Sequence, residues 1–127
     1  PEHKMKAGVE HKVPLSDEAI QIINFMRKQH NHEYVFHNKA TGKHISNNAM
    51  LVFLKKHYNK KKITVHGFRA TFRTWAEETG KYQHYAIEFC LAHQLPTKVE
   101  KSYVRTNLFD MRKIIMKDWE EFVIKNK

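Results

Sequence analysis

The sequence predicts a mainly α-helical domain with a small β-hairpin or sheet at its N-terminal edge, which is an α+β fold. Three observations favour this fold class. Apolar residues recur at helical spacing in several segments, 41% of the residues are hydrophobic, and paired extended segments are suggested only near the N-terminus. A chain of 127 residues is long enough for one domain with one core. We therefore assign residues 1–127 to a single domain.

The extended segments come first. Residues 3–16 are expected to form the hairpin, because two short segments flank Ala7-Gly8 and the second ends in VPLS. Residues 33–38 fit either a short strand or an extended loop, and residues 38–44 form a turn.

The remaining segments are predicted to be helices, from their apolar periodicity and from polar residues that cap their starts. The expected helices cover residues 17–30, 47–58, 66–80, 82–93, 98–105 and 108–125. The second is apolar nearly all round and is expected to be buried, and Gly80 is expected to end the third. The third helix is expected to bury Phe68, Phe72, Trp75 and Ala76. The last helix is expected to bury Leu108, Met111, Ile115, Trp119 and Phe122.

The charge balance favours a polyanionic partner over a merely soluble basic surface. Lys and Arg number 23 against 13 acidic residues, a net charge of +10. The single cysteine, Cys90, excludes an internal disulfide and a zinc site made of several cysteines, and it is predicted to lie in the core. No pair among the ten histidines has helical metal-ligand spacing with a third partner, so no metal is expected.

Other function classes are also disfavoured. The sequence has no run of 18 apolar residues, so no membrane partner is expected and a reducing, cytoplasmic setting fits best. It has no glycine-rich phosphate loop, so no nucleotide cofactor is expected. The opening PEHKMK lacks an initiator methionine, and the chain is therefore expected to be a piece of a longer protein.

Five residues could carry chemistry: Lys6 beside the hairpin turn, His66 and Arg69 where a helix begins, His93, and Tyr103. Each alone has a plain structural explanation, as a solvated charge, a surface pair, a helix cap or a core residue. Their order along the chain is the more specific signal.

That order resembles the catalytic half of the tyrosine recombinases, the phage-integrase family. The segment "MKAG…HKVPLS" resembles the family's hairpin lysine and following strand, and "KSYVR" resembles its nucleophile segment. The segment "HGFRATFRTWAEE" resembles the His-x-x-Arg helix of prophage and genomic-island integrases. Ala92 and Ser102 depart from the usual Leu-Gly-His and Ala-Tyr-x-Arg. The resemblance covers nearly the whole chain.

The resemblance implies the tyrosine-recombinase catalytic-domain fold, with its N-terminal part missing, and a reaction without metal or ATP. Tyr103 would attack a DNA phosphodiester, which gives a 3′-phosphotyrosine and a free 5′-hydroxyl. Arg69 and His93 would contact the phosphate oxygens. Lys6 would protonate the leaving 5′ oxygen, and His66 would assist proton transfer at the tyrosine.

The resemblance implies a first catalytic arginine upstream of the hairpin, and the given sequence is expected to begin after it. The isolated fragment is therefore expected to be weakly active or inactive, because losing one such donor costs on the order of 10²–10³ in rate. The alternative is a non-catalytic DNA-binding module from a decayed prophage integrase. A type IB topoisomerase ranks below both.

The implied partner is double-stranded DNA, on which the full-length protein is expected to form a tetramer in the cytoplasm of a bacterial host. The candidate DNA-contacting residues are basic: Lys60, Lys61, Lys62, Arg73 and Arg105. The last helix either folds back onto its own core or anchors a neighbouring subunit through Trp119, Phe122 and Val123. Folding back is the expected arrangement for a monomer.

Overall fold

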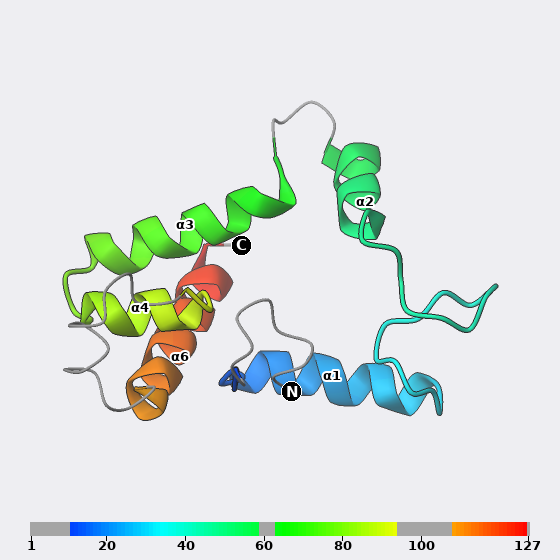
Figure 1. The fold of residues 1–127 in the computed structure, drawn as a ribbon, viewed down its shortest axis with the longest axis horizontal. Helices are drawn as coiled ribbons and strands as arrows, with labels where there is room; N and C mark the ends of the chain where they lie inside the picture. Colours follow the sequence, from blue (N-terminus) through cyan, green and yellow to red (C-terminus); the bar gives the residue numbers. More distant parts are fainter. Residues whose placement is uncertain (1–10, 59–62, 94–107, 127) are drawn as a thin grey trace. The chain divides into compact units, whose positions relative to one another are not determined.

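The computed structural model describes residues 11–58, 63–93 and 108–126, and over these ranges it consists of helices joined by loops, with no strand (Figure 1). The helices are α1 (Asp17–Gln29), α2 (Ala49–Tyr58), α3 (Val65–Glu78), α4 (His84–Cys90) and α6 (Phe109–Lys125). The chain divides into two compact units, Asp17–Thr71 on the one hand and Pro1–Ser16 with Phe72–Lys127 on the other. The boundary between the units falls within α3.

The predicted N-terminal sheet is wrong. Residues 11–16 form neither a helix nor a strand, and they have no strand partner in the described part of the chain. The carbonyl of Lys12 instead accepts a hydrogen bond from the guanidinium Nη2 of Arg112, in α6, and the fully buried Arg112 fixes this segment. Pro14, which has no N–H for a ladder, is buried. The first arm of the predicted hairpin, with Lys6, lies outside the described residues.

Residues 33–38, between α1 and α2, were predicted to form either a short strand or a loop, and they form a loop. Its only β-type pairing among described residues is a single antiparallel bridge between His37 and His44. Asn38 closes the turn between them, since its N–H donates to the carbonyl of Lys43 and its carbonyl accepts from Gly42, both over 2.8 Å. Gly42 has φ of 65°, a conformation that favours glycine.

Helix α3 begins one residue before the predicted start. The side-chain hydroxyl of Thr64 accepts a hydrogen bond from the backbone N–H of Gly67 (3.0 Å), so Thr64 acts as the N-cap. The helix ends at Glu78, two residues before Gly80, and Gly80 adopts φ of 62°, as expected for a glycine that stops a helix.

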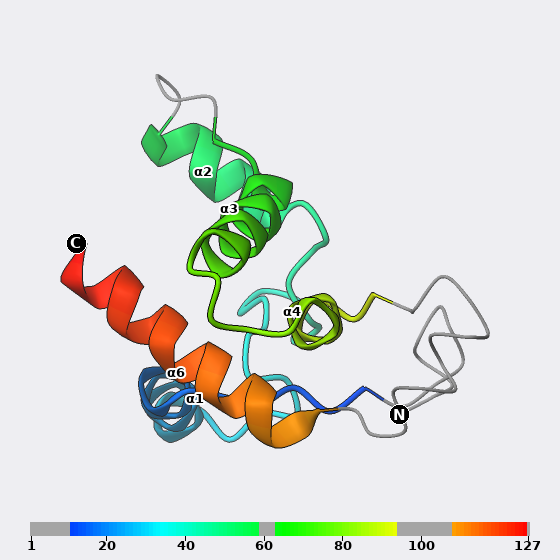
Figure 2. The same ribbon diagram turned by 90° about the vertical axis from the view of Figure 1, so that its left-hand side faces the viewer.

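The core lies in the unit formed by residues 1–16 and 72–127. Helices α4 and α6 pack against each other there, as seen from two sides in Figures 1 and 2. The buried apolar residues come from three helices and the end of α4: Phe72, Ala76, Ala86, Ile87, Leu91 and Ile115. Cys90 packs against this core half-buried, and burial raises the pKa of its thiol.

Trp119 joins α6 to α3 in an aromatic cluster. Its ring centroid lies 5.1 Å from that of Trp75 and 5.5 Å from that of Phe72. Phe122 stacks on Trp119 and also contacts Trp75. In this monomer the last helix therefore folds back onto its own unit, as expected.

The prediction that the second helix is buried is wrong. No residue of α1 or α2 is buried, and Met50, Val52 and Phe53 of α2 are 57%, 61% and 56% exposed. Phe68, predicted to be in the core, is also 56% exposed. An all-round apolar helix is buried only where neighbours cover every side, and the unit Asp17–Thr71 supplies too few of them.

Candidate functional site

The candidate residues His66 and Arg69 lie in the first turns of α3. They are three residues apart and therefore project from neighbouring positions of one helix face, and both are exposed. The cap at Thr64 fixes the start of this helix. The sequence thus places an imidazole and a guanidinium together on the solvent-facing surface of an ordered helix end.

The candidate residue His93 is held by the chain reversal that ends α4. The N–H of His93 donates to the carbonyl of Glu88 (3.0 Å), and the N–H of Ala92 donates to that of Phe89 (3.2 Å). These two bonds are the 6→1 and 5→2 pair of a Schellman motif. The motif requires a left-handed residue directly after the C-cap Leu91, and Ala92 occupies that place with φ of 55°.

This geometry gives a physical reason for the glycine of the usual Leu-Gly-His pattern. Only glycine adopts such a φ without steric cost, and a residue with a Cβ loses roughly 1–2 kcal/mol there. Ala92 is therefore a strained substitute for glycine, and the turn that positions His93 forms in spite of it.

Replacing Ala92 with glycine is expected to raise the free energy of unfolding by about 1 kcal/mol, since it relieves the left-handed strain. Urea unfolding followed by circular dichroism measures this change. Ala70→Gly is the matched control, because Ala70 lies exposed within α3 and the same substitution there should lower stability by about 1 kcal/mol. Equal losses in both variants would contradict the role assigned to Ala92.

Glu88 brings two predicted site residues together. Its Oε1 accepts a hydrogen bond from Nε of Arg73, and its Oε2 accepts one from Nδ1 of His93, each over 2.7 Å. Burial by itself would raise the pKa of Glu88, but the hydrogen bonds from His93 and Arg73 and their charges outweigh burial and lower it. Glu88 is therefore a carboxylate at neutral pH.

Sequence reasoning missed Glu88. The available signal was an acidic residue inside the otherwise apolar segment AIEFCLA, which predicts an ionisable group held near the core and in need of a partner. Arg73, predicted to contact DNA, has a partner within the protein instead of standing alone on the surface.

The remaining predicted site residues lie outside the described residues. They are Lys6, Lys60, Lys61, Lys62, Tyr103 and Arg105, and the helix expected at residues 98–105 lies outside them too. Lys55 and Lys56, which begin the basic run that ends in Lys60, Lys61 and Lys62, are exposed on the last turn of α2.

One group of side chains in the described ranges has the spacing of a metal site, but its chemistry argues against one. The ligand atoms of Glu77, His84 and Glu88 lie within 4.8 Å of one another. His84 already pairs with Glu77 (2.8 Å), and both oxygens of Glu88 are engaged by other donors. A cation would have to displace these partners.

Three histidines of the loop after α1 also cluster. His37 stacks on His32 with ring centroids 4.4 Å apart and meets His30 edge-on at 4.2 Å. Burial, followed by the charges of His30, His32 and Lys39, lowers the pKa of His37. Stacked rings face one another, whereas metal ligands point their nitrogen atoms toward a common centre, so the cluster is a ring-packing arrangement.

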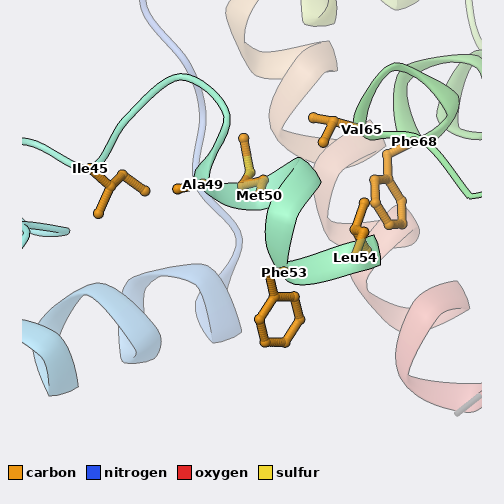
Figure 3. A pocket seen from close by; sticks show the side chains of 7 residues that line it. All are labelled: Ile45, Ala49, Met50, Phe53, Leu54, Val65 and Phe68. Carbon is orange, nitrogen blue, oxygen red and sulfur yellow. The ribbon is translucent and has the colours of Figure 1, made fainter. Parts of the chain in front are cut away.

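An apolar pocket of about 330 Å³ lies within the unit Asp17–Thr71 (Figure 3). Its side chains come from α2, the residue stretch before it and the first turn of α3: Ile45, Ala49, Met50, Phe53, Leu54, Val65 and Phe68. No charged or hydrogen-bonding side chain lines it, so it has no group that would bind a phosphate. Across the described ranges, every helix is too short or too polar to cross a lipid bilayer.

Comparison with known proteins identifies the family. The model of the phage integrase family matches residues 3–108. Curated relatives include the prophage integrases IntZ and IntA of Escherichia coli (strain K12), 32% and 28% identical over 125 residues, and the integrase of Enterobacteria phage P4, 30% identical over 129. Each alignment covers 97% of this chain but only 29–31% of the relative, so the chain spans about a third of their length. No solved structure matches the chain. Since the family model covers most of its residues, the chain belongs to the phage integrase family.

Proposed function

We propose that this chain is part of the catalytic domain of a site-specific DNA recombinase that integrates or excises a mobile element. The observation that carries the proposal is that His93 is held in a defined position. A Schellman turn and the carboxylate of Glu88 hold this exposed imidazole, in a chain whose family membership is shown. A purely DNA-binding surface has no need of an imidazole fixed in this way.

In the proposed reaction Tyr103 is the nucleophile. Its oxygen forms a bond to the phosphorus of the scissile phosphodiester as the bond from phosphorus to the 5′ oxygen breaks. The proton of the tyrosine passes toward His66, and the leaving 5′ oxygen takes a proton from Lys6. Attack by a 5′-hydroxyl on the phosphotyrosine reverses these transfers and rejoins a strand, so the energy of the phosphoester bond is conserved.

The cationic groups stabilise the charge that gathers on the non-bridging oxygens. The planar guanidinium of Arg69 can donate two hydrogen bonds to one phosphate, which a lysine cannot do. His93 would donate one more. A net charge of +10 supports the proposed partner, double-stranded DNA, and predicts binding that weakens as salt rises. We propose that the full-length protein acts as a tetramer on this DNA.

The test uses the full-length protein and nicked duplexes that span the ends of the DNA element encoding it. We expect a covalent protein–DNA complex that survives denaturing electrophoresis, and we expect Tyr103→Phe to abolish it while DNA binding persists. Tyr58→Phe, at an exposed tyrosine at the end of α2, is the matched control and should trap DNA normally. DNA binding without any trapping by the unmodified protein would favour the decayed, non-catalytic alternative.

A further inference from the structure

The unit Asp17–Thr71 has no buried core among its described residues. In the ranges 17–58 and 63–71 every residue is at least partly exposed, whereas the other unit buries a cluster of apolar side chains. Ordering a chain costs conformational entropy, and burial of apolar surface must offset that cost. The helices of this unit therefore need apolar surface from elsewhere.

The uncovered apolar surface gathers at the pocket of about 330 Å³, which we call the α2 pocket (Figure 3). Met50 and Phe53 of α2 and Phe68 of α3 line it, and they are 57%, 56% and 56% exposed. Soluble proteins rarely leave several large apolar side chains together in one exposed patch, and such patches mark contacts with protein. The α2 pocket is thus a docking surface in need of an occupant.

We propose that the α2 pocket binds an apolar segment of the same polypeptide that lies outside residues 1–127. The alignments cover only 29–31% of each curated relative, so most of such a protein lies outside the matched region. A segment joined through the chain has an effective concentration of about millimolar for a short linker, far above that of a separate molecule. A tethered segment therefore competes better for the pocket than a second copy does.

The chemistry of the pocket defines the segment that fits it. Sites for small molecules carry a few polar groups that fix the orientation of the ligand, and no polar side chain lines this pocket. Apolar side chains of a protein segment can fill it without leaving a polar group unsatisfied.

The borders of the pocket are basic. The exposed residues Lys43, Lys55 and Lys56 lie within two residues of lining residues, and residues 34–76 contain no Asp or Glu. Acidic side chains in the docked segment would complement this charge. We therefore expect the segment to be apolar at its centre and acidic at its edges.

Photocrosslinking in the full-length protein identifies the occupant directly. The photoreactive amino acid p-benzoylphenylalanine takes the place of Phe53, and we expect a crosslink to a peptide from outside residues 1–127 of the same molecule. Mixing isotopically labelled and unlabelled protein tests whether the crosslink stays within one molecule. The matched control has the photoreactive residue in place of Phe36, which is 48% exposed and does not line the pocket, and it should not give this crosslink.

Every other result of the crosslinking experiment would overturn the inference. A crosslink to residues 1–127 of the same molecule would mean that this part of the chain covers its own pocket. A labelled peptide joined to an unlabelled one would assign the pocket to a second copy. Absence of any crosslink at Phe53 would mean that no segment of the protein docks there.

A stability measurement provides a second test. Phe53→Glu should lower the urea midpoint of the full-length protein, because it places a charge in a closed apolar contact. The midpoint should not depend on protein concentration, since the contact lies within one molecule. Phe36→Glu is the matched control and should leave the midpoint unchanged. An unchanged midpoint in Phe53→Glu, or a midpoint that rises with protein concentration, would contradict docking within the polypeptide.

The inference does not depend on the proposed reaction. Neither measurement uses DNA, so the crosslink can form in a protein that traps no DNA, and only the proposed function would then have failed. Covalent trapping of DNA without the crosslink would leave the proposed function standing and overturn the docking.

Discussion

Replacing Arg69 with alanine in the full-length protein is expected to slow covalent trapping of nicked DNA by about 10²–10³-fold, the cost of losing one preorganised donor to a phosphate in the transition state. Arg69 sits on the exposed face of α3 near its capped start, which suits a contact with an external phosphate. The measurement is the single-turnover rate of complex formation at saturating protein. A loss confined to DNA affinity, with the saturated rate unchanged, would assign Arg69 to binding alone.

Two further variants sharpen this experiment. Arg69→Lys keeps the charge but cannot donate two parallel hydrogen bonds, so its rate should stay well below that of the unmodified protein. Arg27→Ala removes an exposed arginine from the last turn of α1 and should leave the saturated rate unchanged. If Arg69→Lys matched the unmodified protein, only positive charge would be needed at this position.

Replacing Trp119 with alanine is expected to lower the free energy of unfolding by about 3 kcal/mol, the lower end for a large core aromatic residue, since Trp119 is only half-buried. The loss reflects its ring contacts with Phe72, Trp75 and Phe122. Urea unfolding of the monomer measures it. The matched control is Val123→Ala, at a 41% exposed position of the same helix, which should change stability by about 0.5 kcal/mol or less.

This pair of variants also tests the alternative in which the last helix anchors a neighbouring subunit. An anchor residue would leave the monomer's stability unchanged when removed and would weaken assembly on DNA. A neutral Trp119→Ala with loss of the DNA-bound oligomer in sedimentation would therefore contradict the packing described for α6.

Much of the helical framework could be predicted from local signals. The predicted start of α3 differs from the observed start by one residue, and the cap that sets this start, Thr64 with Gly67, is a contact within one turn. Gly80, predicted to stop the helix, lies two residues beyond its last residue, Glu78, and has φ of 62°. Caps and apolar periodicity act over a few residues, so the sequence displays them directly. The three-residue spacing of His66 and Arg69 likewise places them on one predicted helix, whereas their candidate roles follow from the order of the five residues and the family resemblance.

The errors arose where distant partners decide the outcome. The local pattern of residues 11–16 suits a strand, but the carbonyl of Lys12 finds its donor in Arg112, one hundred residues away. The apolar pattern of α2 suits a core, yet no element of its unit covers Val52 or Phe53. Extended backbone becomes a strand, and apolar surface becomes core, only when another part of the chain supplies the matching face.

By itself the sequence determined the family, the order of the candidate catalytic residues and the approximate positions of the described helices, because each of these resides in residue types and short spacings. Only the tertiary structure decided that Glu88 joins Arg73 to His93 and that Ala92 takes the left-handed conformation that turns His93 back onto Glu88. The first contact bridges 15 residues between two helices, and the second depends on a backbone angle that alanine rarely adopts. Neither can be read from a spacing, since both exist only once packing has fixed the helices against each other.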